Sequence, residues 1–133
     1  MAIADIRKGL GTNLGTIRGL RVAEYIPDNP SPPIAVVALA NVQYDGAFQG
    51  GLVTYNFTVS CIVGRVAERE AQRRLDAFIS TGAGGIKHAI ESEKSLGGSA
   101  YDVKVTEMNN IGAVQLGDAT YLGCDFNVEV YSN

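Results

Sequence analysis

Apolar and polar residues alternate along several stretches of this sequence. The longest such run extends from Val53 to Val63, where every second residue is apolar. A period of two predicts a β-strand with one face in the core and the other polar. The polar positions of this strand are Thr54, Asn56, Thr58 and Ser60. Further strands are predicted at 20–26, 34–39, 101–105, 113–116 and 122–130.

Apolar residues spaced three or four apart predict helices in three other segments. The first is marked by Ile3, Ile6, Leu10, Leu14 and Ile17, despite three interspersed glycines. The second runs from Arg65 to Ser80 with a buried stripe of Ala71, Leu75, Phe78 and Ile79. A shorter helix is predicted from Ile86 to about Ser92.

This order of elements predicts an α+β fold. Most connections between the strands are of hairpin length, which favours a mainly antiparallel sheet packed by helices on one face. The 133 residues suffice for one core, so we expect a single domain over residues 1–133. The glycine-rich segment from Asn41 to Gly51 is expected to be a loop or hairpin tip.

Net charge and hydropathy exclude two classes of function. The chain has 11 basic and 14 acidic residues, a net charge of -3, which weakly opposes a polyphosphate partner and disfavours a DNA-binding role. The longest apolar stretches, such as Ile34 to Ala40, are far shorter than the roughly 20 residues of a membrane span. Charges at Asp5, Arg7 and Lys8 lead us to expect no signal peptide.

The sequence contains no convincing catalytic, cofactor-binding or metal-binding constellation. His88 is the only histidine, and no cysteine or carboxylate lies at ligand spacing from it. Glu91 and Glu93 are two residues apart on a predicted helix, so we interpret them as solvated charges. Cys61 and Cys124 lie on apolar strand faces, which favours buried free thiols and leaves a disulfide open. We therefore expect no enzyme.

Charges of opposite sign are segregated along the chain. Arg65, Arg69 and Arg73 recur every four residues, whereas the segment from residue 86 onward has three basic and seven acidic side chains. Asp125 and Glu129 lie on the polar face of the last strand. A solvated helix face is the ordinary explanation. The sharper hypothesis is that the arginines contact the acidic strand of a neighbouring copy.

Residues spread over nearly the whole chain resemble a known family in their order and spacing. They include Gly19-Leu20-Arg21-Val22, Tyr25-Ile26-Pro27-Asp28, Pro32-Pro33, Val63-Gly64-Arg65, Leu96-Gly97-Gly98 and Tyr121-Leu122-Gly123. The chain resembles the small tail terminator proteins of long-tailed bacteriophages, particularly those that infect actinobacteria. It departs from the family at Gly84-Gly85, where a serine cap is common.

The resemblance implies a structural, protein-binding function without catalysis. Such proteins form a ring of usually six copies that caps the head-proximal end of the tail tube, stops its polymerisation and joins it to the head. The implied partners are further copies of the chain, the tail tube protein and the head-tail connector, with DNA passing non-specifically through the lumen. The implied location is the virion tail, after assembly in the bacterial cytoplasm.

The resemblance also gives expected roles to particular residues. Thr54, Asn56, Thr58 and Ser60 would line the lumen, and the loop carrying Tyr44, Asp45 and Phe48 would contact the tube or the connector. The alternative for this loop is that its aromatic side chains fold back on the core.

Other functions remain open from the sequence. The chain could be another phage head-tail connector or a tail tube subunit, and a tube subunit would polymerise by itself. A small enzyme or ligand-binding domain, the alternative from a different class, would require a pocket with converging titratable groups.

Overall fold

The computed structural model describes residues 3–25, 31–44, 52–116 and 119–132. Its elements, in chain order, are α1 (Ile3–Leu14), β1 (Arg21–Ala23), β2 (Ile34–Gln43), β3 (Val53–Arg65), α2 (Arg69–Ile79), α3 (Ile86–Ile90), the 3-10 helix η1 (Leu96–Gly98), β4 (Asp102–Leu116) and β5 (Ala119–Ser132).

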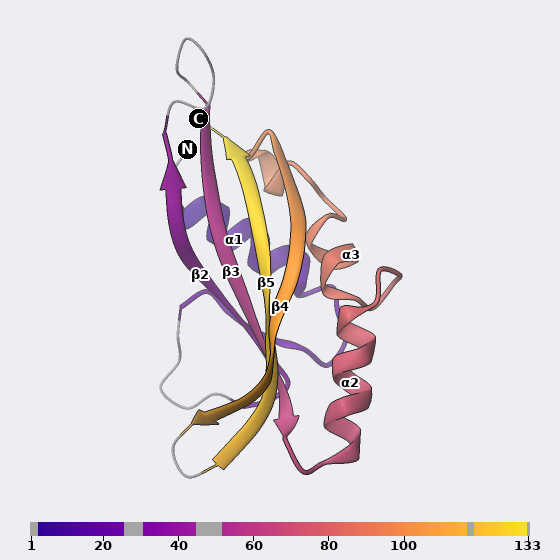
Figure 1. Cartoon of the computed structure of the whole chain (residues 1–133). Helices are drawn as coiled ribbons and strands as arrows, with labels where there is room; N and C mark the ends of the chain where they lie inside the picture. The colour runs from indigo at the N-terminus through magenta and orange to yellow at the C-terminus, as the bar shows by residue number, and fades with distance from the viewer. Residues whose placement is uncertain (1–2, 26–30, 45–51, 117–118, 133) are drawn as a thin grey trace.

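The strands form one sheet of five in the order β1-β2-β3-β5-β4. The short strand β1 runs parallel to β2, and all the other neighbours are antiparallel. Figure 1 views the twisted sheet from the side that carries no helix, with α1 behind the strands and α2 and α3 beside them. The predicted α+β architecture, with a mainly antiparallel sheet, is confirmed.

The core lies between the helices and one face of the sheet. Strand β3 shows the reason, because Phe57, Val59 and Cys61 are buried on the helix side while the residues between them face the other way. The three helices contribute the apolar residues at their three- and four-residue spacings. These are Ile6, Leu10 and Leu14 of α1, Ala71, Leu75 and Phe78 of α2, and Ile86, Ala89 and Ile90 of α3.

Two predicted boundaries are wrong because strand pairing extends beyond the local pattern. Helix α2 begins at Arg69, since Arg65 is still the last residue of β3 and pairs with Tyr121 of β5. Strand β2 continues through Asn41, Val42 and Gln43, which were predicted as part of a loop or hairpin tip, because they pair with Thr54 to Asn56. Cross-strand hydrogen bonding here outweighs the polar local sequence.

The two strands predicted at 101–105 and 113–116 are one strand, β4. Its register against β5 shifts between Val105 and Glu107 and again between Asn109 and Gly112. Asn110 has a φ of 58°, a left-handed conformation that asparagine tolerates better than most residues. These irregularities absorb the extra residues that break the alternation. Gly117 and Asp118, which join β4 to β5, lie outside the described residues.

Candidate interaction surfaces

We define the arginine edge as the exposed side chains of Arg65, Arg69 and Arg73. Arg69 and Arg73 lie one turn apart on α2, but Arg65 belongs to the end of β3, so the three arginines do not form the single helical stripe predicted from their spacing. Their guanidinium groups have no hydrogen-bond or ion-pair partner among the described residues. The arginine edge is therefore free to bind an anionic group from outside.

We define the open sheet face as the polar side of β3 and β5, the side without helices. Cross-strand register pairs Asn56 with Glu129, Thr58 with Asn127, and Ser60 with Asp125. The Ser60 hydroxyl donates to Asp125 at 2.8 Å, and the Asn56 amide donates to Asn41 of β2 at 2.7 Å. Thr54 also lies on this side, but it is only 9% exposed. The other three predicted polar positions of β3 are half-buried.

The two carboxylates of the predicted interface are already held within their own chain. Asp125 accepts hydrogen bonds from Ser60 and from the Asn110 amide at 3.0 Å. Glu129 accepts one from the Tyr131 hydroxyl at 2.7 Å and lies 3.6 Å from the Lys104 ammonium. Neither carboxylate contacts Arg69 or Arg73 of the same chain, because these two arginines lie on α2 at the helix side of the sheet. Such a contact would require two copies.

The predicted loop contact is only partly described. Tyr44 follows the end of β2 and is 74% exposed, so it does not fold back on the core. Asp45 and Phe48 lie outside the described residues. The tyrosine ring is a large amphipathic group at the end of the sheet, which is a common component of protein interfaces.

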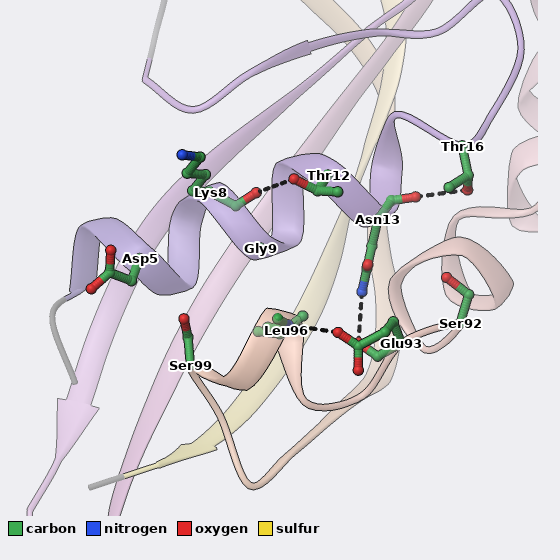
Figure 2. A pocket seen from close by; sticks show the side chains of 11 residues that line it. Asp5, Lys8, Gly9, Thr12, Asn13, Thr16, Ser92, Glu93, Leu96 and Ser99 are labelled. Carbon is green, nitrogen blue, oxygen red and sulfur yellow. Dashed lines mark hydrogen bonds between the residues drawn. The ribbon is translucent and has the colours of Figure 1, made fainter.

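A groove of about 450 Å³ lies between α1 and the segment that joins α3 to β4 (Figure 2). At its base the amide of Asn13 donates to the backbone carbonyls of Ile90 at 2.8 Å and Glu93 at 2.9 Å. Gly9 faces Leu96, and a Cβ on Gly9 would lie 2.7 Å from the Leu96 Cβ. No pattern in the sequence predicted these contacts, and the glycines of the α1 segment were the one sign of a close approach.

The carboxylate of Glu93 at this groove has a structural role. It accepts hydrogen bonds from the Ser95 hydroxyl, the Ser95 N–H and the Gly97 N–H. The hydrogen bond from the Ser95 side chain is the main cause that lowers the pKa of Glu93, and the two backbone donors add to it. These bonds link Glu93 to Ser95 and Gly97, so the carboxylate stabilises the turn.

Glu91 also differs from the predicted solvated charge. Its carboxylate bonds the Lys87 ammonium and accepts the Val105 N–H of β4 at 2.9 Å. Partial burial would raise the pKa of Glu91, but the hydrogen bonds from Lys87 and Val105 and the charges of Lys87 and Lys94 outweigh it and lower the pKa. Sequence spacing alone could have indicated the Lys87 pair, since the two residues are four apart on a helix.

Histidine, cysteine and acidic side chains are the groups that most often bind metal ions or act as nucleophiles and acids. Within the described ranges, no group of three or more histidine, cysteine or acidic residues could hold a metal ion. His88 is exposed, and Cys61 and Cys124 are buried free thiols directly opposite each other on β3 and β5. Burial raises the pKa of Cys124 to about 11, with a smaller contribution from the charge of Asp125, and burial likewise raises that of Cys61.

Two further observations concern the whole chain. None of the helices in the described part combines the length and the apolar character that crossing a bilayer requires. A comparison with known protein families finds none that matches this chain, and a comparison with curated proteins finds no match either.

Proposed function

We propose that the chain is the subunit of a homo-oligomeric ring that acts as a tail terminator of a long-tailed bacteriophage. The ring, of six copies as in the family that the sequence resembles, caps the head-proximal end of the tail tube, stops its polymerisation and joins the tail to the head connector. The proposal combines the sequence resemblance with the two complementary surfaces described above.

The observation that supports a ring is the position of these surfaces on opposite sides of one sheet. A ring needs a heterologous interface, in which one surface of each copy fits a different surface of the next. Arg69 and Arg73 of the arginine edge lie on α2, on the helix side, and the carboxylates of Asp125 and Glu129 lie on the open sheet face. Since the carboxylates are pre-oriented by their own partners and a carboxylate has about four acceptor sites, each can still accept a guanidinium.

The rest of the open sheet face suits the lumen of such a ring. Apart from Asp125 and Glu129, its described side chains are mostly neutral amides and hydroxyls, with Lys104 and Arg65 as basic groups and Glu107 as a further acid. DNA binds tightly where several clustered basic groups replace its counterions, whereas on the described part of this surface acidic side chains lie beside Lys104. DNA could therefore pass along it without being held.

The exposed Tyr44 and the segment after it form the proposed contact with the tube or the connector. Removal of residues 45–50 should abolish capping of tail tubes, because the contact is lost, and should leave the ring intact. Electron microscopy of tubes mixed with the variant measures capping, and sedimentation measures the ring. Tubes that are still capped by the variant would contradict this role.

The ring is tested by measuring the mass of the purified protein alone and after mixing with tail tubes. The variant Arg69→Glu/Arg73→Glu should lose the ring, since four units of negative charge are added to the basic side of the interface. Arg18→Glu/Lys94→Glu makes the same change in charge at exposed residues away from the arginine edge, and should assemble like the wild type.

Three outcomes contradict the proposal. The first is a wild-type chain that remains monomeric even when bound to tubes, and the second is equal loss of assembly in both double variants. Unlimited polymerisation of the wild type alone is the third, and it would identify a tube subunit instead.

A further inference from the structure

Strand β4 is an edge strand with an exposed backbone. It ends the sheet on one side, and no described strand pairs with its outer edge. The outward N–H and C=O groups of an edge strand can pair with a strand of another molecule, which leads to unwanted association. At 15 residues β4 is the longest strand, so this hazard is considerable.

Lys87 of α3 and Glu91, the C-cap residue of this helix, occupy the outward backbone groups of one residue in β4. The Val105 N–H donates to Glu91 Oε2 at 2.9 Å, and the Lys87 ammonium donates to the Val105 carbonyl at 3.4 Å. Lys87 and Glu91 also bond each other across one helical turn. The N–H and the carbonyl of Val105 are therefore both bonded to side chains, and neither is free to pair with the backbone of another strand.

The helix α3 and the strand β4 both fix the position of the contact between Lys87, Glu91 and Val105. Helix α3 is anchored by the buried Ile86, Ala89 and Ile90, and the side chain of Glu91 is only 19% exposed. Directly after Val105 the register of β4 shifts, which interrupts the regular edge. Val105 is the fourth of the 15 residues of β4, so its occupied backbone groups lie in the first half of the strand.

The other side of the sheet has a similar contact. Strand β1 covers only Ile34 to Val36 of β2. The next carbonyl, that of Val37, accepts a hydrogen bond from the Arg7 guanidinium at 2.9 Å. Arg7 also bonds the Glu24 carbonyl at 3.0 Å and lies 4.7 Å from the centre of the Tyr25 ring. Side chains from helices thus cover backbone groups at both margins of the sheet.

We propose that Lys87 and Glu91 form an edge guard that prevents β4 from pairing with β4 of a second copy of this chain. Pairing of an edge strand with itself in antiparallel orientation is self-complementary and would give a two-fold dimer. If the chain is a ring subunit, the guard removes a contact that competes with the ring. The guard acts in the free chain, so its test does not depend on that function.

The test compares variants that remove or keep the guard. Lys87→Ala/Glu91→Ala removes both groups without a change in net charge. Glu91→Gln keeps an oxygen that can accept the Val105 N–H. Arg18→Ala/Glu70→Ala is the control, because it removes one charge of each sign from exposed side chains that do not contact β4. Circular dichroism and thermal melting establish that each variant folds.

Analytical ultracentrifugation over a dilution series measures self-association. Without the guard, the average mass should rise with concentration to roughly twice that of the wild type or more. Glu91→Gln and the control should follow the wild type. Hydrogen exchange provides a second measurement, in which the Val105 N–H should exchange roughly tenfold faster at low concentration once Glu91 is removed.

Each result decides the proposal. A mass curve of Lys87→Ala/Glu91→Ala that coincides with that of the control overturns the guard. If that double variant does not fold, Glu91→Ala alone takes its place in both measurements. A Val105 N–H that exchanges in the wild type as fast as an exposed amide also overturns the proposal, whatever the variants do.

Discussion

The contact between Gly9 of α1 and Leu96 of η1 predicts opposite effects for two similar substitutions in one helix. In Gly9→Ala the new Cβ would lie 2.7 Å from the Leu96 Cβ and 2.8 Å from its carbonyl oxygen. Both atoms are attached to or part of the backbone, so neither can turn away. In Gly11→Ala the nearest atoms are those of Glu24, at 3.4 Å and beyond, which is ordinary contact with a flexible side chain.

The magnitudes follow from two opposing effects. Replacing glycine by alanine inside a helix is favourable by about 1 kcal/mol. Overpacking typically costs about 1–3 kcal/mol, and the rigid neighbours at Gly9 place it in the upper part of that range. Gly9→Ala should therefore lower the free energy of unfolding by about 1–2 kcal/mol, whereas Gly11→Ala should raise it by up to about 1 kcal/mol.

Urea denaturation of the wild type and both variants measures the difference. The slope of the unfolding free energy with urea should be unchanged, since both substitutions act on the folded state more than on the area exposed. In thermal melts the shift should be about 4 °C per kcal/mol for a chain of 133 residues. A Gly9→Ala protein as stable as Gly11→Ala would refute the close approach of α1 to η1.

Three further predictions follow from buried or paired groups. Asn13→Ala should lower the unfolding free energy by about 1–3 kcal/mol in urea melts, because it leaves the buried carbonyl of Ile90 and the partly buried carbonyl of Glu93 without this donor. The contacts that lower the pKa of Glu91 stabilise the folded chain in full above the ordinary glutamate pKa of about 4.3. This stabilisation is lost as the pH falls through the lower pKa of Glu91 in the folded chain. Thermal melts from pH 6 to pH 3 should show this loss in the wild type and lack it in Glu91→Gln. The thiols of Cys61 and Cys124 should react with a disulfide reagent at neutral pH only after denaturant unfolds the chain, because burial disfavours their thiolates.

The fold class followed from the sequence because the apolar periodicities report burial directly. The alternation in β3 gave the correct core face, and the spacing of apolar residues located all three α-helices. The boundaries depended instead on distant partners. Arg65 looks helical by its spacing to Arg69, yet pairing with Tyr121 keeps it in β3. The polar end of β2 is likewise a strand only because β3 lies beside it.

The candidate surfaces were predictable only as far as they depend on single elements. The amides, hydroxyls and carboxylates of β3 and β5 share a face because strands alternate, and the sequence shows this. The sequence could not show that Ser60 and Asn110 hold Asp125, because those contacts depend on cross-strand register. As a result, Asp125 and Glu129 look free in the sequence, but both already bond side chains of their own chain.

The largest gap concerns contacts between side chains and distant backbone groups. A carboxylate on a short helix, such as Glu91, is indistinguishable in sequence from a solvated charge, and its spacing to Lys87 indicates a surface ion pair of small energetic value. It becomes a guard only because β4 is an edge strand whose Val105 faces that helix. A charged pair near an edge strand should therefore be judged by the backbone groups that it covers as well as by its own attraction.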